Sequence, residues 1–529
     1  MGQDISKSIT PPPLTLHHCF VDGKIDIPRY LYYRRKLDDQ IELSQSISNR
    51  LNTKRKFDEG QSPIVQCRKK RSVKRHKLLV RDDDDSLREL TPKDTLWYLL
   101  YVHTPPRNDR LRRQFRLRFR MPYDTFVSMC GDLTNHEMFD IYNKYDAVGD
   151  KASDIRLLLL GVLRYIGRAW TLDDVEEANG ISRETNRRFL SLFLEYGSTI
   201  LYRKWVIDPS LNKKISDQEK LFRLAGFNGC IGSSDATHVG MLSCAAWAQV
   251  LNKGYKLNMP SRTYNMTVDH SRWILGSTLG HPATWNDKTL ILYDELVCGV
   301  NNGNIPDDFE FMLYERNEKG EVVEVAYKGV WFMVDNGYLN WSCTVPPVKD
   351  GTSYEVIRFS EWLESMRKDV ECAFGILKGR FAILRYGIRL RSIAKCDKVW
   401  LTCCALHNML LHIDGLNKNW GNGVPSDWEI INETNKGSPK HLSVPFAITR
   451  LNRQFTEKLN TELKLSDSIA YEDEGNRIIN YNRYTVNGKR VVSKMPLSVF
   501  QNCLVENFDI RYKQNDIIWP RHIKQPQVI

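Results

Sequence analysis

Three acidic side chains, far apart in the sequence, stand where they could meet at one edge of a sheet. Asp235 and Asp335 are each predicted to end a strand, and Glu371 lies in a helical segment. Carboxylates placed in this way can share two divalent ions about 4 Å apart, one to activate water or a 3′-hydroxyl and one to stabilise the departing oxygen. The pattern predicts a site for two Mg²⁺ (or Mn²⁺) ions that acts on phosphodiester bonds, with the three acids as catalytic residues and metal ligands.

Each acid taken alone also has a structural interpretation. An aspartate directly after a strand is usually a turn-former. Glu371 could simply pair with Arg367, one helical turn before it. These alternatives stay open at the level of single residues.

The segment around Glu371 is basic. Residues 358–398 contain 10 Lys and Arg against 5 Asp and Glu. The cations predicted to flank Glu371 and to neutralise DNA phosphates are Arg367, Lys368, Lys378 and Arg380. The alternative is a solvated helix face.

Other polar residues near the acids are assigned less specific roles. His238 either lines the pocket or is a satisfied structural histidine. For Asp287 a helix cap is preferred over a fourth carboxylate, with Asn286 competing for the cap. His407 and Asn408 are expected to hydrogen-bond in the core of a packed helix.

The elements that must position these residues alternate between strands and helices over 220–415, which predicts an α/β domain. Strands are expected at 229–235, 263–268, 273–279 and 330–335, and helices at 360–376 and 398–411. The run Val330 to Val334 is apolar throughout, as in a strand buried on both faces.

Residues 90–200 show helical periodicity and a helix-turn-helix pattern. A helix over 154–168 is followed by a capping box at Thr171 and Asp174, a turn at Gly180, and a helix capped by Ser182. Three arginines are expected on the outer face of that last helix, where they could contact DNA: Arg183, Arg187 and Arg188. Plain helical packing gives the same pattern and remains the alternative.

The net charge of +12 resides mainly in the first 80 residues, which contain 17 Lys and Arg against 8 Asp and Glu. Residues 1–88 are predicted to be a disordered basic tail. Its two clusters are typical of a bipartite nuclear import signal: Lys54, Arg55, Lys56, then Arg68, Lys69, Lys70 and Arg71. Gly2 also fits the short myristoylation pattern.

The composition excludes several classes of protein. No apolar run reaches the roughly 18 residues that a membrane span needs. The 12 cysteines show no CxxC spacing, which argues for reduced thiols rather than disulfides or a zinc ribbon.

Residues 416–529 are predicted to be a tail with a docking segment near 497–520.

Several stretches resemble PIF/Harbinger transposases, and they occur in that family's order: 235–238, 280–287, 334–338, 367–381 and 406–409. Arg367 to Gly375 is the most specific of them, and the resemblance covers roughly 100–415, with 497–520 similar to the family's closing segment. Ala283 stands where the family usually has glycine.

The resemblance implies an RNase H-like fold whose DDE triad falls on Asp235, Asp335 and Glu371. It implies Mg²⁺-dependent cleavage of transposon ends and joining to target DNA, with a separate Myb-like DNA-binding partner; the predicted import signal adds that the protein acts in the nucleus. A homo-oligomer is compatible with that role. Two alternatives stay open: a domesticated nuclear protein that binds DNA without cutting it, and a nuclease acting on RNA or hybrid duplexes.

Overall fold

The computed structural model of the chain describes residues 20–21, 24–25, 79–81, 86–144, 152–207, 215–302, 309–349, 351, 353–415, 477–478, 482–486, 489–493 and 495–517. The chain divides into two compact units, Met1–His76 and Lys77–Ile529. In the first, the described elements are β1 (Phe20–Val21) and β2 (Lys24–Ile25), which pair antiparallel. The predicted nuclear import signal lies outside the described residues.

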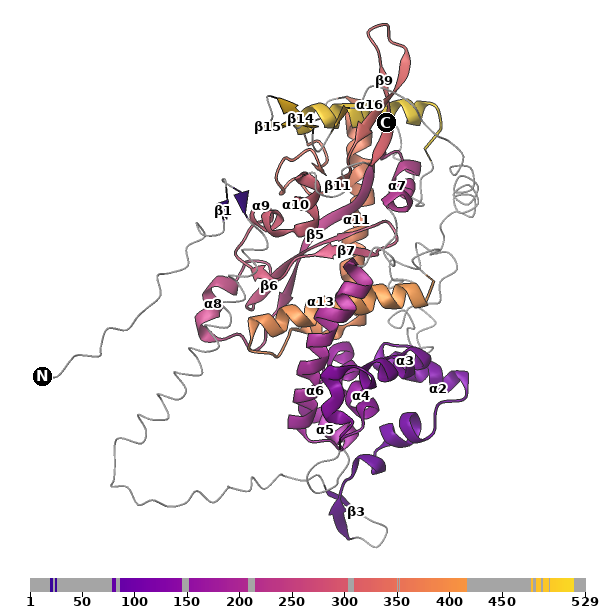
Figure 1. Cartoon of the computed structure of the whole chain (residues 1–529), viewed down its shortest axis with the longest axis vertical. Helices are drawn as coiled ribbons and strands as arrows, with labels where there is room; N and C mark the ends of the chain where they lie inside the picture. Colours follow the sequence, from indigo (N-terminus) through magenta and orange to yellow (C-terminus); the bar gives the residue numbers. More distant parts are fainter. Residues whose placement is uncertain are drawn as a thin grey trace, which may run out of the picture. The chain divides into compact units, whose positions relative to one another are not determined.

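The second unit begins with a short hairpin and a helical region (Figure 1). The hairpin is formed by β3 (Leu79–Arg81) and β4 (Leu87–Glu89). The α-helices are α2 (Asp109–Phe119), α3 (Tyr123–Thr134), α4 (Ile155–Arg168), α5 (Leu172–Asn179) and α6 (Arg183–Tyr196). Short 3-10 and π turns join them: η2 (Pro92–Asp94), η3 (Tyr98–His103), η4 (Glu137–Tyr142), η5 (Gly197–Leu201) and η6 (Arg203–Ile207).

The caps predicted for α5 and α6 are present. Thr171 and Asp174 form the capping box, and the Ser182 side chain accepts a hydrogen bond from the backbone N–H of Thr185. Gly180, at φ +65°, occupies the left-handed conformation that ends α5. The helix predicted over 154–168 and the two helices predicted after Thr171 and after Ser182 are thus confirmed as secondary structure.

Two buried asparagines fix the turn between α5 and α6. Asn179 donates to the Asn186 side-chain oxygen at 2.9 Å and accepts from the Ile181 N–H at 2.9 Å. Asn186 in turn donates to the Ile181 carbonyl at 2.7 Å. Because buried amides are stable only when hydrogen-bonded, this network sets the angle at which α6 leaves the turn.

The outer face of α6 carries the predicted arginines. The side chains of Arg183, Arg187 and Arg188 are 66%, 52% and 69% exposed. Arg187 and Arg188 both pair with Glu184, at 2.7 and 2.9 Å. Exposed pairs of this kind contribute little stability, so the arginines can exchange Glu184 for another anion at small cost.

The central sheet has the strand order β12-β11-β5-β6-β7, with β8 pairing β6. Its members are β5 (Cys230–Gly240), β6 (Ser261–Val268), β7 (Ile274–Ser277), β8 (His281–Pro282), β11 (Trp331–Met333) and β12 (Thr344–Val345). The strands β5, β6 and β7 run antiparallel in succession, whereas β11 runs parallel to both β5 and β12. The sheet is therefore mixed, as an α/β domain requires.

One strand is longer than the sequence predicted. The strand expected to end at Asp235 continues to Gly240, with its last residues paired to β6 as far as Gly240 and Ser261. Thr237 and Val239 in this continuation are β-branched and suit a paired strand. Asp235 thus lies within β5 rather than at its end.

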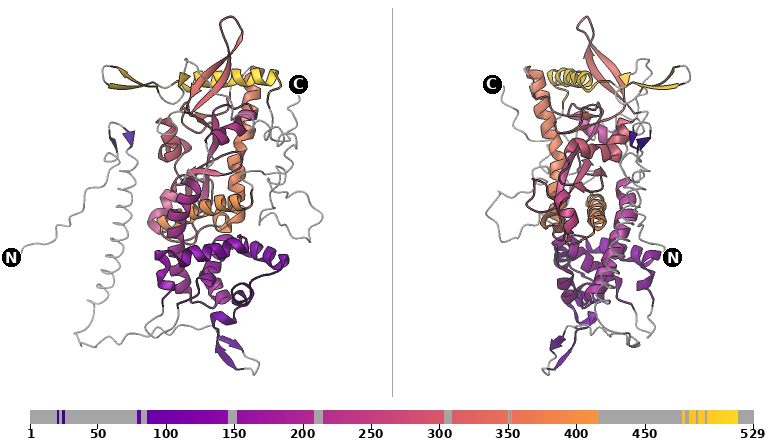
Figure 2. Two further views of the ribbon diagram at one scale, coloured as in Figure 1. Left: turned by 45° about the vertical axis from the view of Figure 1, so that its right-hand side comes forward. Right: turned by 90° about the vertical axis from the view of Figure 1, so that its left-hand side faces the viewer.

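Helices cover the sheet and connect it to the helical region (Figure 2). The long α11 (Tyr354–Arg380) packs along β5, β6 and β11, and α13 (Ile393–Ile413) packs on β7 and α6. Cys403 and Cys404 are buried in α13. The remaining helices are α7 (Ile215–Leu224), α8 (Ala246–Asn252), α9 (Asp287–Leu290), α10 (Glu295–Asn301) and α12 (Ala382–Tyr386), with the turn η7 (Ile291–Tyr293).

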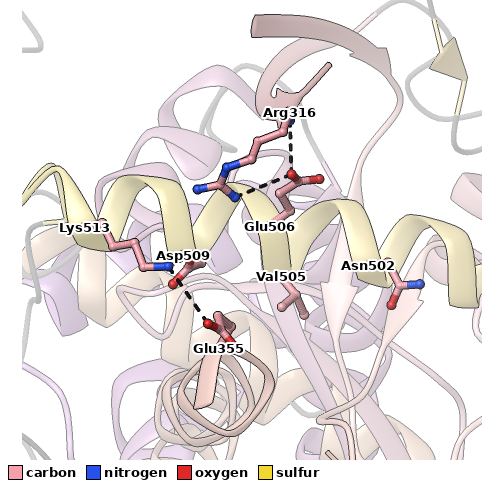
Figure 3. A pocket seen from close by; sticks show the side chains of 7 residues that line it. All are labelled: Arg316, Glu355, Asn502, Val505, Glu506, Asp509 and Lys513. Carbon is pink, nitrogen blue, oxygen red and sulfur yellow. Dashed lines mark hydrogen bonds and ion pairs between the residues drawn. The ribbon is translucent and has the colours of Figure 1, made fainter. Parts of the chain in front are cut away.

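A C-terminal helix closes the far end of the sheet domain. The predicted docking segment is α16 (Leu497–Lys513), which packs on α11 and on β9 (Glu310–Arg316). Val505, Phe500 and Phe508 are buried there, while Arg316–Glu506 and Lys513–Glu355 form ion pairs across the contact (Figure 3). A pocket of about 290 Å³ lies along this helix, and none of the three predicted catalytic acids lines it.

The strand β9 belongs to a second sheet with β10 (Val322–Lys328) and β13 (Arg477–Ile478). A separate hairpin is formed by β14 (Asn482–Val486) and β15 (Lys489–Ser493). None of the helices in the described residues has the length and apolar character needed to span a membrane.

The asparagine network of the α5–α6 turn can be tested by replacing Asn186 with alanine. We expect Asn186→Ala to lower the free energy of unfolding by about 1–3 kcal/mol, since buried partners lose their hydrogen bonds. Thermal or urea unfolding measures the loss. Arg188→Ala, on the exposed face of the same helix, is the control and should change stability by less than ~0.5 kcal/mol. Equal stability of the two variants would contradict a structural role for Asn186.

Candidate active site on the central sheet

Asp235 lies in β5, and Asp335 follows the neighbouring parallel strand β11, which ends at Met333 instead of at Asp335 as predicted. The register of β5 and β11 pairs Gly232 with Phe332 and Ser233 with Met333. Each aspartate stands two residues beyond the last of these pairs, on strands that a parallel ladder holds about 4.8 Å apart. The strand pairing therefore brings the two predicted acids to the same place on the sheet.

The loop after β11 holds the Asp335 carboxylate in a turn. Asp335 accepts a hydrogen bond from the backbone N–H of Gly337 at 3.1 Å, and its carbonyl accepts from the N–H of Tyr338 at 3.2 Å. Tyr338 is buried and donates to the side-chain oxygen of Asn265 on β6 at 2.7 Å. Asp335 therefore forms a turn, as the structural interpretation of the sequence expected. Its side chain is nevertheless exposed to solvent.

Helix α11 brings Glu371 close to Asp235 through Arg367. The Arg367 guanidinium lies 3.2 Å from Asp235 Oδ2 and 3.0 Å from Glu371 Oε1. The same side chain donates to both oxygens of Glu364, at 3.1 and 2.7 Å. The intrahelical pair between Arg367 and Glu371 is thus present, and it also reaches across to the sheet. We call these four residues the guanidinium bridge.

Burial distinguishes Asp235 from the other two acids. Its side chain is 22% exposed against 48% for Glu371. Burial is the main reason that the pKa of Asp235 is raised to about 6, and the negative charges of Asp287 and Glu371 add to it. The Ala236 N–H and Arg367 act in the opposite direction. This place therefore concentrates negative charge that a cation can neutralise.

Asp287 contributes a fourth carboxylate to this place, which corrects the preference for a helix cap. The N-cap of α9 is Asn286, whose side chain accepts from the Thr289 N–H at 2.9 Å. Asp287 lies against the turn after β11: a Cβ added to Gly337 would be 3.1 Å from Asp287 Oδ2. Burial raises the pKa of Asp287, and the Asp335 charge raises it further. Because Asn286 occupies the N-cap, Asp287 lies in the first turn of α9 and its carboxylate faces the turn that contains Asp335.

The residue types at this place fit a divalent cation. Four carboxylates supply the hard oxygen ligands that Mg²⁺ and Mn²⁺ prefer. A cationic group, the Arg367 guanidinium, already lies between Asp235 and Glu371. As the side chains stand, no three His, Cys, Asp or Glu residues in the described ranges gather closely enough to hold one metal ion. Metal binding would require the bridge to open.

Lys378 joins α11 to β5 instead of facing solvent. Its ammonium donates to Thr237 Oγ1 at 2.7 Å and to the His238 carbonyl at 3.0 Å, and burial lowers its pKa to about 8. His238 bonds Thr263 Oγ1 at 3.1 Å, and burial lowers its pKa to about 4. His238 is thus a satisfied neutral histidine, the structural role that the sequence left open.

The structure corrects the prediction that Arg380 contacts DNA. Arg380 is fully buried at the end of α11, and its positive charge helps to lower the pKa of buried His407. Arg367 is also only 7% exposed and already paired. Of the four cations predicted to flank Glu371, Lys368 is the one that lies exposed. The periodicity of the sequence did not distinguish the buried from the exposed face of α11, because this helix packs against other elements on more than one side.

A buried ionic cluster positions α11 against the sheet. Asp369, two residues before Glu371, lies 2.7 Å from His270 Nδ1 and 2.8 Å from Arg272 Nη2. All three side chains are at most 6% exposed. His270 and Arg272 belong to the turn between β6 and β7. Ionic groups in the protein interior are stable only in close pairs. This contact therefore fixes the position of the turn of α11 that contains Asp369 and Glu371.

The turn between β6 and β7 is also bound to α13. His407 Nε2 bonds the Arg272 carbonyl at 2.9 Å, and the Asn408 side chain bonds both the N–H and the carbonyl of Ile274 at 2.9 Å. Both residues are fully buried. The predicted core hydrogen bonding of His407 and Asn408 is confirmed.

Residues 206–416 match the model of a family described as plant transposon protein. The matched part contains the four acids and the bridge. No curated protein and no solved structure matches the chain. The family match supports a transposase-derived protein.

The ionic cluster gives a stability test. Asp369→Asn leaves the Arg272 charge buried and poorly compensated, so we expect the free energy of unfolding to fall by about 3–5 kcal/mol. Urea unfolding measures this. Glu361→Gln, an exposed acid on the same helix, should shift stability by less than ~0.5 kcal/mol. Asp369→Asn with wild-type stability would show that the cluster does not hold α11.

Proposed function

We propose that this transposase-derived chain is a DDE-type DNA endonuclease of the PIF/Harbinger kind, with an RNase H-like catalytic domain. In this proposal it cleaves transposon-end DNA and joins the freed 3′-hydroxyl to target DNA. The observation that carries the proposal is that the Arg367 guanidinium joins Asp235 to Glu371, while the pairing of β11 with β5 brings Asp335 to the same edge of the sheet as Asp235. The mixed sheet order, three antiparallel strands followed by two parallel ones, supports the RNase H-like assignment.

The chain's own residues would do the following work. Asp235 and Asp335 would hold two Mg²⁺ or Mn²⁺ ions from the sheet, and Glu371 would complete the set from α11. When bound, the ions polarise the scissile phosphate and activate water or a 3′-hydroxyl. Exposure of Asp335 and Glu371 leaves room for a DNA strand to approach from solvent. Arg367 would keep its contact with Glu364 and neutralise charge beside the phosphate.

DNA recognition is proposed for α6. Its three exposed arginines can bind the backbone or the major groove, and the network of Asn179 and Asn186 holds the helix at a fixed angle. Import into the nucleus and a separate Myb-like partner complete the proposal.

A second candidate is a nuclear protein that binds DNA without cutting it. The guanidinium bridge favours it, because Arg367 occupies the space between two of the acids and could serve as a permanent structural cation. The two candidates make opposite predictions for metal-dependent cleavage.

Cleavage is tested with the full chain and DNA carrying the element's terminal repeat. Asp335→Asn should abolish Mg²⁺- or Mn²⁺-dependent nicking, a loss of at least about 10³-fold, because the charge that binds the metal is removed. Glu318→Gln, exposed at the β9–β10 turn, is the matched control and should cleave normally. Wild type and Asp335→Asn that both bind DNA without cutting it would favour the second candidate.

Opening of the bridge is tested by metal binding itself. Arg367→Gln removes the internal cation that competes for the acids, so we expect it to bind Mn²⁺ more tightly, by about tenfold or ~1.4 kcal/mol. Electron paramagnetic resonance of free Mn²⁺ measures this without DNA or activity. Lys368→Gln, which removes the same charge from an exposed neighbour, should change affinity much less. Weaker Mn²⁺ binding by Arg367→Gln would mean that the guanidinium helps to build the site.

A further inference from the structure

A segment rich in exposed apolar and basic residues lies between β5 and β6. Residues 241–268 contain no Asp or Glu, although 64 acids occur in the chain. The part from α8 to β6, residues 246–260, contains Lys253, Tyr255 and Lys256, and all three are exposed. We call residues 250–256 the α8 loop. The charged side chains of the α8 loop are all positive, so the loop attracts anions.

Tyr255 is the most exposed large apolar side chain in this loop, at 87%, and Val250 follows at 80%. A tyrosine ring left in water forgoes the burial that normally stabilises it. The Lys256 ammonium lies 6.0 Å from the centre of the Tyr255 ring. An aromatic face and a cation are thus presented together.

The loop is held firmly on both sides of this exposed pair. Asn252 is 2% exposed and donates to the Ala248 carbonyl at 2.8 Å. Gly254 packs so closely that an added Cβ would lie 2.5 Å from the Ala283 carbonyl oxygen. The Thr284 hydroxyl donates to the Leu251 carbonyl at 3.1 Å. Tyr255 is therefore displayed by an anchored backbone.

These anchors also place the loop beside the acids. Ala283 and Thr284 lie just before Trp285 and Asn286, the residues that lead into α9, which begins with Asp287. The Lys256 charge acts on both Asp287 and His238: it opposes the burial that raises the pKa of Asp287, and it adds to the burial that lowers the pKa of His238. The α8 loop is thus anchored next to the segment that leads to Asp287 of the candidate active site.

We propose that the α8 loop binds the DNA strand next to the scissile phosphate, with an unpaired nucleobase stacked on Tyr255 and backbone phosphates on Lys253 and Lys256. This inference rests on the proposed function and names a binding surface for its substrate. Stacking on an aromatic ring accepts any base, whereas the lysines require a polyanion. A neutral apolar partner would satisfy the ring and leave the two cations without a role.

The test uses DNA of arbitrary sequence, because stacking does not depend on it. The full chain, carrying Asp335→Asn so that DNA is not cut, is titrated with a duplex bearing a single-stranded tail that contains 2-aminopurine. We expect a change in 2-aminopurine fluorescence on binding, and Tyr255→Ala should lose this change and bind about tenfold more weakly. Tyr255→Phe should retain both.

Two matched controls isolate the ring and the charge. Tyr354→Ala removes a tyrosine that is 72% exposed on the same helix as Glu371, about 25 Å along its axis, and should bind tailed DNA normally. Lys253→Gln with Lys256→Gln should weaken binding and reduce the salt slope by about 1.4, as loss of two phosphate contacts predicts for a single strand.

The outcomes separate this inference from the proposed function. Equal binding by wild type, Tyr255→Ala and Tyr354→Ala would overturn the stacking role and point to a protein partner, even if the Mg²⁺-dependent cleavage occurs. An equal loss on blunt duplex and tailed DNA would also overturn it, since no unpaired base is then read. A chain with Asp335 intact that neither binds nor cuts DNA would overturn both.

Discussion

The contact of one guanidinium with acids from two elements is the interaction on which the candidate site depends. Arg367 spans from α11 to β5 and contacts Asp235, Glu364 and Glu371 within 3.2 Å. Without a cation, acids so close together would repel one another and raise each other's pKa, as Asp235 partly shows. A cation of some kind is therefore part of the folded site, and the competition between Arg367 and a divalent ion becomes the central chemical question.

The rest of the fold serves to hold α11 at this distance. The buried cluster of Asp369, His270 and Arg272 binds the middle of α11 to the β6–β7 turn, and His407 and Asn408 bind that turn to α13. Lys378 fixes the next helical turns to β5. The polar residues of this domain thus divide into two sets: the acids of the candidate site, which can meet a substrate, and buried groups that set the position of those acids.

The sequence predicted the elements better than the environments of their side chains. The spacing of apolar residues located β6, β7, β11, α11 and α13. An element that is buried on one face, or on both, has apolar residues at a regular spacing that is visible in the sequence. The strand end after Asp235 was misplaced, since β5 continues through small and polar residues that pair with β6.

Side-chain environment depends on packing between distant segments, which periodicity does not contain. Arg380 looked like a surface cation and is buried; Asp287 looked like a cap and faces Asp335 because Asn286 takes the cap. The pairing of β11 with β5, which brings Asp335 to Asp235, joins residues a hundred positions apart. The residue types and the order of the family-like stretches suggested that the three acids meet. The register of β11 on β5 gives the physical reason why Asp335 lies near Asp235.

The central claim is that the acids hold divalent metal ions once Arg367 gives way. A crystal structure of the full chain with Mn²⁺ and an uncut DNA end, with manganese located by its anomalous scattering, tests it most directly. We predict manganese bound to Asp235 and Asp335, with the Arg367 guanidinium displaced from Asp235 and retained by Glu364. Manganese absent from these acids, with the guanidinium still bridging Asp235 and Glu371 beside bound DNA, would contradict the account.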